Sequence, residues 1–189
     1  SCNLRCQGCW VDVDKPEKRI SLEDMNRVIT DAKNHGNAYF GILGGEPFQH
    51  PELMEIFAAH PDCYFQVFTN GQMITDAVAK RLRLLGNVSP LISIEGSEIV
   101  SDERRGRLNV YNHTLAGLEA CRRNKLIIGV ATSVCQTNYE LVPEAWLQKL
   151  IGMGGHSAWF HTYRFVGPEP AWHLALTKGR ALTRRRFTV

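Results

Sequence analysis

The sequence predicts an α/β fold with a parallel sheet, and three observations support this class. Five short apolar segments alternate with amphipathic segments along the chain. The apolar segments lack a strict polar alternation, which is typical of strands buried on both faces of a parallel sheet. Glycine or polar residues follow the apolar segments, as expected where strands end. A closed barrel and an open sheet both fit this order of elements.

The helices are predicted from local start and stop signals. The segment from Ser21 to Asp24 reads as a capping box at the start of the first helix, and Gly36 ends that helix. Pro51 and Pro143 stand where the first turn of a helix tolerates proline. The predicted helices span residues 21–35, 51–59, 76–85, 111–124 and 142–151.

The strands are predicted from apolar runs that are bounded by turn signals. They span residues 38–43, 63–68, 91–94, 126–134 and 158–166. The polar, charged segment 97–107 is predicted as a loop. We therefore expect one core domain over residues 1–168, and a tail or the start of a further segment over residues 169–189.

The composition excludes several classes of protein. The chain has 189 residues, 44% of them hydrophobic, which suffices for one domain but is short for a complete eight-stranded barrel of ~250 residues. A net charge of +3 does not indicate a nucleic-acid partner. No apolar run reaches ~18 residues, so no membrane span is predicted. The scattered Cys63, Cys121 and Cys135 argue against a disulfide framework and indicate a reducing, cytoplasmic compartment. Cys63 and Cys121 are predicted to be packed thiols. Cys135 lies just past a predicted strand end and is interpreted as structural, with a radical-quenching or auxiliary-cluster role as the alternative.

The N-terminal segment holds three closely spaced cysteines, Cys2, Cys6 and Cys9, in the pattern C-x3-C-x2-C. Clustered thiolates favour a soft metal, and iron–sulfur clusters are bound by cysteine thiolates. A four-iron cluster ordinarily takes four cysteines, so three cysteines leave one iron open to another ligand. The alternative is a zinc site that a distant Cys or His completes, although zinc usually prefers C-x2-C pairs.

Polar and glycine residues gather at the predicted carboxyl ends of the strands, where parallel α/β folds bind ligands. The residues at these ends include Gly44, Gly45, Glu46, Pro47, Thr69, Asn70, Gly71, Ser93, Glu95, Gly96, Thr132, Ser133, Tyr163 and Arg164. The cysteines would lie at the same mouth, after a strand that precedes Ser1. We therefore expect a metal cluster, an exposed glycine backbone and several polar side chains to share one site.

The chain resembles the radical SAM superfamily, because its cysteine spacing is that superfamily's cluster motif and Gly44-Gly-Glu-Pro47 ends the next strand. The resemblance covers essentially the whole chain and implies a partial (β/α)6 TIM-like barrel, with the first strand truncated before Ser1. It implies a [4Fe-4S] cluster on Cys2, Cys6 and Cys9, with S-adenosylmethionine on the remaining iron. Reductive cleavage of S-adenosylmethionine would give a 5′-deoxyadenosyl radical, which removes hydrogen from a substrate that the sequence does not identify. An external electron donor, similar to flavodoxin or ferredoxin, is implied as a partner.

Further cofactor contacts follow from the resemblance, position by position. The Gly44-Gly45 backbone would approach the cofactor's ammonium group, and Glu46 would add an opposite charge or a fixed hydrogen bond. Ser93 matches a serine that contacts the cofactor in similar enzymes. Arg105 matches an arginine that holds the cofactor's carboxylate, for which a planar fork is suited, and Arg104 is the competing choice.

One position departs from the family's pattern. In many members an aromatic residue precedes the third cysteine and packs on adenine, whereas this chain has Gly8 there. Tyr163 is the candidate that would supply the missing adenine contact. Thr69, Asn70 and Ser133 are expected to contact the ribose or the amino acid part of the cofactor.

Two rival functions stand beside the radical enzyme. One is a structural zinc or iron–sulfur module without catalysis, and the other is a degenerate relative that binds partners and has lost its chemistry. The intact cysteine and glycine motifs argue against the degenerate relative.

Overall fold

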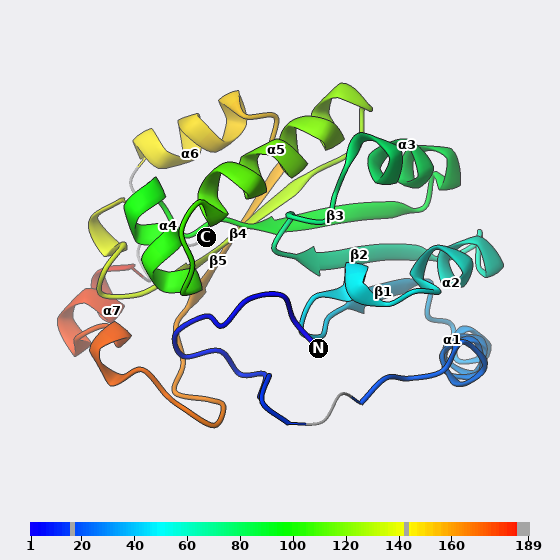
Figure 1. The fold of residues 1–189 in the computed structure, drawn as a ribbon, viewed down its shortest axis with the longest axis horizontal. Coiled ribbons are helices and arrows are strands. Elements are labelled where there is room, and N and C mark those ends of the chain that lie inside the picture. The colour runs from blue at the N-terminus through cyan, green and yellow to red at the C-terminus, as the bar shows by residue number, and fades with distance from the viewer. Residues whose placement is uncertain (16–17, 142–143, 185–189) are drawn as a thin grey trace.

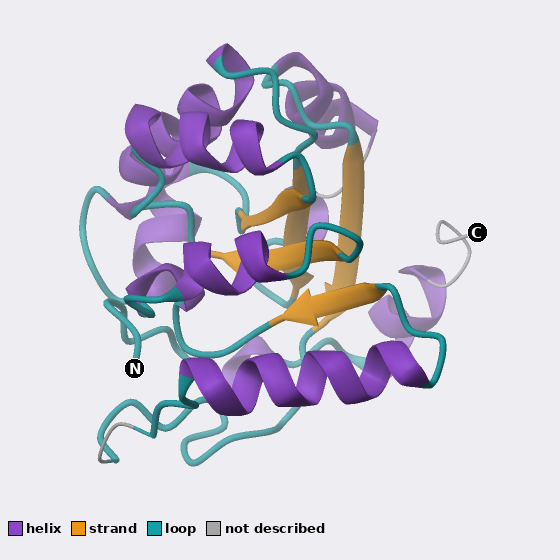
Figure 2. Cartoon of the chain, turned by 90° about the vertical axis from the view of Figure 1, so that its right-hand side faces the viewer, coloured by secondary structure: helices purple, strands orange, loops and turns teal. Residues whose placement is uncertain are grey.

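The computed structural model describes residues 1–15, 18–141 and 144–184. Within them, five strands form one sheet in the order β1-β2-β3-β4-β5, and every neighbouring pair is parallel (Figure 1). The strands are β1 (Tyr39–Ile42), β2 (Tyr64–Thr69), β3 (Val88–Ser93), β4 (Gly129–Val134) and β5 (Ser157–Thr162). The sheet curls into a half-barrel with helices between its strands, so the prediction of a partial TIM-like barrel is confirmed (Figure 2).

Helices α2 to α6 connect successive strands, α1 precedes β1 and α7 follows β5. They are α1 (Leu22–Asn34), α2 (Leu53–Ala59), α3 (Asp76–Leu85), α4 (Glu98–Arg105), α5 (Val110–Arg123), α6 (Glu144–Gly152) and α7 (Lys178–Arg184). The described residues also form the short 3-10 helices η1 (Pro47–Gln49), η2 (Tyr139–Leu141) and η3 (Trp172–Leu174). The Ser21 hydroxyl accepts a hydrogen bond from the Asp24 amide at 3.0 Å, as the predicted capping box requires. The first two residues of the helix predicted over 142–151 lie outside the described residues.

The prediction of a loop after β3 is wrong, because this segment contains α4. Ser97 caps the first turn, and Gly106 ends the helix in the left-handed conformation at φ 69°. The buried residues of α4 are Ser101, Asp102 and Arg104 rather than an apolar stripe. The helix therefore has no apolar periodicity that a sequence pattern detects.

The main apolar core lies between the outer face of the sheet and its helices. Phe57 on α2 packs against Phe65 on β2 with ring centroids 4.9 Å apart, and both side chains are fully buried. Burial of one such side chain contributes about 1.5–3 kcal/mol. Cys63 and Cys121 belong to this core, so the prediction that they are packed thiols is confirmed. Burial raises the pKa of Cys121 to about 12.

The opposite, concave side of the half-barrel faces the N-terminal segment, which runs across it (Figure 1). No strand precedes the cysteines in the described residues. A small second cluster at the end of β5 contains Cys135, Tyr163 and Leu174. Residues just past 168 thus contact the core, while the predicted domain boundary stays a prediction. Among the described residues, no helix has the length and apolarity that crossing a membrane requires.

Candidate functional site

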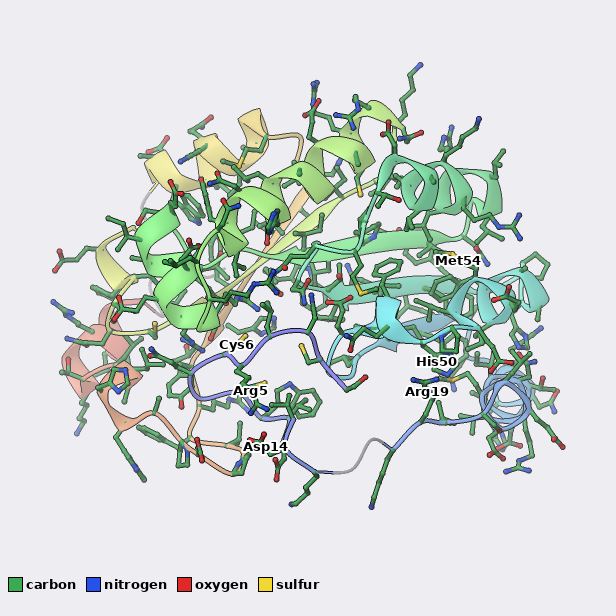
Figure 3. All side chains as sticks on the ribbon, in the orientation of Figure 1. Arg5, Cys6, Asp14, Arg19, His50 and Met54 are labelled. Atoms are coloured by element: carbon green, nitrogen blue, oxygen red, sulfur yellow. The ribbon has the colours of Figure 1, made fainter. Side chains whose placement is uncertain are left out.

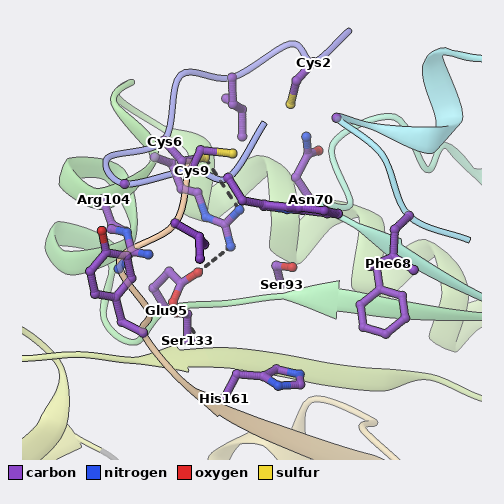
Figure 4. Close-up of a pocket in the computed structure, with 18 of the residues that line it drawn as sticks. Cys2, Cys6, Cys9, Phe68, Asn70, Ser93, Glu95, Arg104, Ser133 and His161 are labelled. Carbon is purple, nitrogen blue, oxygen red and sulfur yellow. Dashed lines mark hydrogen bonds and ion pairs between the residues drawn. The ribbon is translucent and has the colours of Figure 1, made fainter. Parts of the chain in front are cut away.

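A cavity of about 660 Å³ lies at the carboxyl ends of the strands, and Cys2, Cys6 and Cys9 line it (Figure 4). This volume is within the usual range of roughly 300–1,000 Å³ for small-molecule sites. The cavity is also lined by the predicted residues Gly44, Gly45, Thr69, Asn70, Ser93 and Arg105. The fold therefore brings together residues that stand more than a hundred positions apart in the sequence.

Strand register explains why polar side chains from different strands share this cavity. Ser93 of β3 pairs with Ala131 of β4, and Ser133 of β4 pairs with His161 of β5. Side chains of paired residues project from the same face of a sheet. Ser93, Ser133 and His161 all line the cavity, so the concave face presents hydroxyl and imidazole groups toward the cysteines.

The N-terminal segment is folded tightly around the cysteines. The Cys9 amide donates to the Cys6 carbonyl at 3.2 Å, and Gly8 between them has φ 64°, a left-handed conformation that favours glycine. Arg5 and Asp14 form an ion pair on the outer part of this segment (Figure 3). The segment is thereby closed on itself before it reaches α1.

The donor set fits a four-iron cluster better than a single zinc ion. Cys2, Cys6 and Cys9 line the cavity together, and three cysteines are one fewer than the four protein ligands of a structural zinc site. A zinc site needs its sulfurs at about 2.3 Å from one ion, whereas each cysteine of a four-iron cluster binds a different iron. Burial raises the pKa of the Cys2 and Cys6 thiols, and Arg105 opposes that rise at Cys6. Metal binding would therefore displace thiol protons.

The two glycines of the Gly-Gly-Glu-Pro motif have different surroundings. A Cβ built on Gly45 would lie 1.8 Å from the Ser1 carbonyl oxygen, which accepts a hydrogen bond from the Glu46 amide at 2.9 Å. A Cβ on Gly44 would meet no atom within 4 Å, although Gly44 lines the cavity. Gly45 is therefore required by the cysteine segment, whereas Gly44 leaves room for a ligand.

Glu46 anchors the ends of two strands to each other. Its carboxylate accepts hydrogen bonds from the Thr69 hydroxyl at 2.7 Å, the Asn70 amide at 2.8 Å and the Phe48 amide at 3.2 Å. Burial raises the pKa of Glu46, and these donors oppose that rise. Glu46 and Pro47 are buried beside the cavity rather than on its lining, so their direct contact with a cofactor stays a prediction.

Thr69 and Asn70 line the cavity, but their side chains also bind within the protein. The Thr69 hydroxyl accepts from the Gly71 amide at 3.0 Å while donating to Glu46. The Asn70 amide group donates to the Asn3 side chain at 2.7 Å. Asn70 thus links the end of β2 to the cysteine segment, and a contact of either side chain with ribose stays a prediction.

Arg105 joins the cysteines to the opposite wall of the cavity. Its Nη2 is 2.6 Å from Glu95 Oε1, and its Nη1 is 3.8 Å from Cys6 Sγ. Burial alone lowers the pKa of Arg105, but the Glu95 carboxylate and the Cys6 sulfur outweigh burial and raise it above its ordinary value. Arg105 therefore holds a positive charge against the cavity, where an anionic group of a ligand would be stabilised.

Glu95 stood among the predicted strand-end residues, but no role was predicted for it. Glu95 is buried and also accepts a hydrogen bond from the Ser133 amide at 3.1 Å, so it orients Arg105 and β4 together. The signal for Glu95 was its place two residues after Ser93, which ends β3. Asn3 and Gln7 gave no such signal, because their partners lie far away along the chain.

Comparisons with known proteins agree with this site. The family model described as the radical SAM superfamily matches residues 1–144. The AdoMet-dependent heme synthase of Methanosarcina barkeri is 27% identical over 165 residues, which cover 84% of this chain and 47% of that protein. The sporulation killing factor maturation protein SkfB of Bacillus subtilis is 27% identical over 147 residues, which cover 76% of this chain and 36% of that protein.

Among solved structures, SuiB of Streptococcus suis bound to S-adenosylmethionine superposes with a TM-score of 0.78 at 17% identity, covering 98% of this chain and 44% of SuiB. At that identity the match supports the fold. The chain spans half or less of the length of these relatives.

Proposed function

The chain belongs to the radical SAM superfamily, and we propose that it is the radical-generating core of an enzyme with an unidentified substrate. The observation that supports this proposal is the single cavity that three thiols, the Gly44-Gly45 backbone and Arg105 line together. When bound, a [4Fe-4S] cluster and S-adenosylmethionine supply one-electron cleavage of the sulfonium to methionine and a 5′-deoxyadenosyl radical that removes hydrogen from substrate.

Different residues of the cavity would bind the cluster and the amino acid part of the cofactor. Cys2, Cys6 and Cys9 would each bind one iron and leave the fourth iron for the cofactor's amino and carboxylate groups. The open space over Gly44 would receive the amino acid part, with backbone carbonyls as acceptors for its ammonium. Arg105 would pair with its carboxylate.

The remaining predicted residues would complete the cofactor site. Ser93 would donate or accept a hydrogen bond from the strand end that faces the cysteines. Thr69 and Asn70 would contact ribose or the amino acid part, and Glu46 and Pro47 would hold the turn that exposes the glycine backbone. The Tyr163 ring would supply the adenine contact that Gly8 lacks.

The proposal also includes an electron donor and a compartment. A cluster of this kind needs an external one-electron reductant, for which a small flavodoxin- or ferredoxin-like protein is suited. All six cysteines are free thiols in the structure, which agrees with the reducing environment of the cytoplasm.

Anaerobic reconstitution of the full chain with iron and sulfide tests the function. We expect a cluster with absorbance near ~410 nm, as thiolate-ligated iron–sulfur centres show, and 5′-deoxyadenosine formation from S-adenosylmethionine plus dithionite. The Cys2→Ala, Cys6→Ala, Cys9→Ala triple variant should lose both, whereas Cys63→Ala, a buried cysteine of the main core, should keep both. Stoichiometric zinc with no cluster uptake would instead support the structural zinc module.

A further inference from the structure

Arg104 is a buried arginine whose side chain serves the cysteine segment. The residue is 8% exposed, and none of the ion pairs among the described residues includes it. Its Nε donates to the Gln7 carbonyl at 2.9 Å, and its guanidinium lies 5.0 Å from the centre of the Tyr163 ring. Its Nη1 lies 3.5 Å from Cys135 Sγ. Burying a charge in this way is costly unless hydrogen bonds satisfy it, so these contacts define where the side chain belongs.

The backbone of α4 binds the same segment from its carboxyl end. The last carbonyls of a helix have no partner within the helix. Here the Arg104 carbonyl accepts from the Gln7 amide at 2.9 Å, and the Glu103 carbonyl accepts from the Gln7 side chain at 3.2 Å. Gln7 lies between Cys6 and Cys9. The carboxyl end of α4 therefore binds the cysteine motif through hydrogen bonds from this one residue.

Tyr163 contacts the cysteine motif at Gly8. A Cβ on Gly8 would lie 2.3 Å from the Tyr163 hydroxyl oxygen, so the ring packs directly over Gly8. The Ala171 amide donates to that hydroxyl at 2.9 Å, which fixes the ring from the chain beyond β5. Arg104 and Gly8 thus both contact the Tyr163 ring, which also lines the cavity.

We propose that Arg104 is a positioning residue that locks the segment between Cys6 and Cys9 in its cluster-binding conformation. The proposal rests on the proposed function, because it concerns the cluster that the function requires. Arg104 and Arg105 are adjacent and both line the cavity, yet their side chains bind different partners. Arg105 pairs with Glu95, whereas Arg104 donates to Gln7 of the segment that presents the sulfurs. Without the Arg104 side chain, the Gln7 carbonyl and one face of Tyr163 lose their partner.

This role of Arg104 is tested by the rate of iron release. The reconstituted full chain is mixed with an excess of chelator, and the rate at which it loses iron is measured. Arg104→Gln should release iron roughly tenfold faster or more, since a hydrogen bond from a charged donor is lost. Arg104→Lys keeps the charge but cannot donate to Gln7 in the planar geometry and cover the Tyr163 ring together, so its release should lie between Arg104→Gln and the parent. Arg107→Gln, an exposed arginine just after α4, is the matched control and should release iron at the parent rate.

Two further measurements separate positioning from a general loss of stability. The electron paramagnetic resonance spectrum of the dithionite-reduced cluster should broaden in Arg104→Gln and recover partly in Arg104→Lys. Urea unfolding of the metal-free chain measures the general loss of stability, and iron release from Arg104→Gln should accelerate by more than that loss accounts for. The proposal would be overturned if Arg104→Gln released iron at the rate of the Arg107→Gln control and its electron paramagnetic resonance spectrum were unchanged. If Arg104→Gln does not fold, the same outcome in Arg104→Lys would overturn the proposal. A parent chain that takes up no cluster would overturn the proposed function instead.

Discussion

Replacing Gly45 with alanine should loosen the cluster without disturbing the fold, and the structure allows the effect to be worked out. The new Cβ would stand 1.8 Å from the Ser1 carbonyl oxygen and 3.0 Å from Cys2 Cβ. Separations below 3.0 Å are essentially never seen for real Cβ atoms, so the segment that holds Cys2 must move by about 1.2 Å. That movement breaks the hydrogen bond from the Glu46 amide to Ser1.

The two costs set the expected magnitude. Overpacking costs about 1–3 kcal/mol and a lost hydrogen bond about 0.5–1.5 kcal/mol, so closing the Cys2 segment becomes less favourable by about 1.5–4.5 kcal/mol. At 1.4 kcal/mol per tenfold, the affinity of the cysteines for the cluster should fall at least roughly tenfold, and up to roughly 1,600-fold. Chelator titration of the reconstituted protein under anaerobic conditions measures that affinity.

Gly44→Ala is the matched control, because the same methyl group there meets no protein atom within 4 Å. It should retain the cluster within about twofold, and weaken S-adenosylmethionine binding in equilibrium dialysis because Gly44 lines the cavity. Equal cluster retention in Gly45→Ala and Gly44→Ala would refute the reasoning, since the two glycines would then not differ in role.

Three other substitutions test contacts that stabilise the fold, and urea unfolding measures their effects. Gly117→Ala on α5 should destabilise the chain by about 2–3 kcal/mol despite the helix preference for alanine, because its Cβ would stand 2.0 Å from the Gly71 carbonyl oxygen. Glu95→Gln should cost about 3 kcal/mol, because it leaves the partly buried Arg105 without its carboxylate. Burial, helped by Lys33, lowers the pKa of His60, so the unfolded chain gains a proton that the folded chain excludes as pH falls below about 6.5. The unfolding free energy should therefore decrease from pH 7 to pH 5, and His60→Gln should flatten that decrease.

Each of these substitutions has a control on the same chain. Gly152→Ala, where a Cβ meets no atom within 4 Å, should be neutral or slightly stabilising. Glu98→Gln replaces an exposed side chain and should keep the parent stability, and the parent chain is the reference for the pH profile of His60→Gln. If a control variant changed the unfolding free energy as much as its test variant does, the contact proposed to explain the test variant would be contradicted.

The secondary structure was predictable wherever the signal is local. Ser21 and Gly36 mark the ends of α1 in the sequence, and the apolar segments mark all five strands, although β3 begins at Val88 rather than at 91. Pro90 obscured that start, because proline lacks the amide that a central strand normally uses. The helix α4 was missed because its buried side is polar and owes its burial to contacts with distant parts of the chain.

The candidate site was predictable as a set of residues but not as a set of contacts. The cysteine spacing and the Gly-Gly-Glu-Pro motif identified the metal ligands and the exposed backbone, since each lies within one short segment. Glu46 and Arg105 were assigned to the cofactor, yet the structure gives them additional partners in Thr69, Asn70 and Glu95. Those partners come from other strands, so only folding reveals them.

The sequence by itself determined the family, the α/β order and the three cysteines, because these depend on residue types at short spacings. Only the tertiary structure decided that Arg104 binds Gln7, 97 positions away, while its neighbour Arg105 faces Glu95 and Cys6. It also decided that Tyr163 fills the space beside Gly8. The physical reason is that hydrogen bonds and packing act over a few ångströms in space, and the curl of the sheet determines which distant residues come that close.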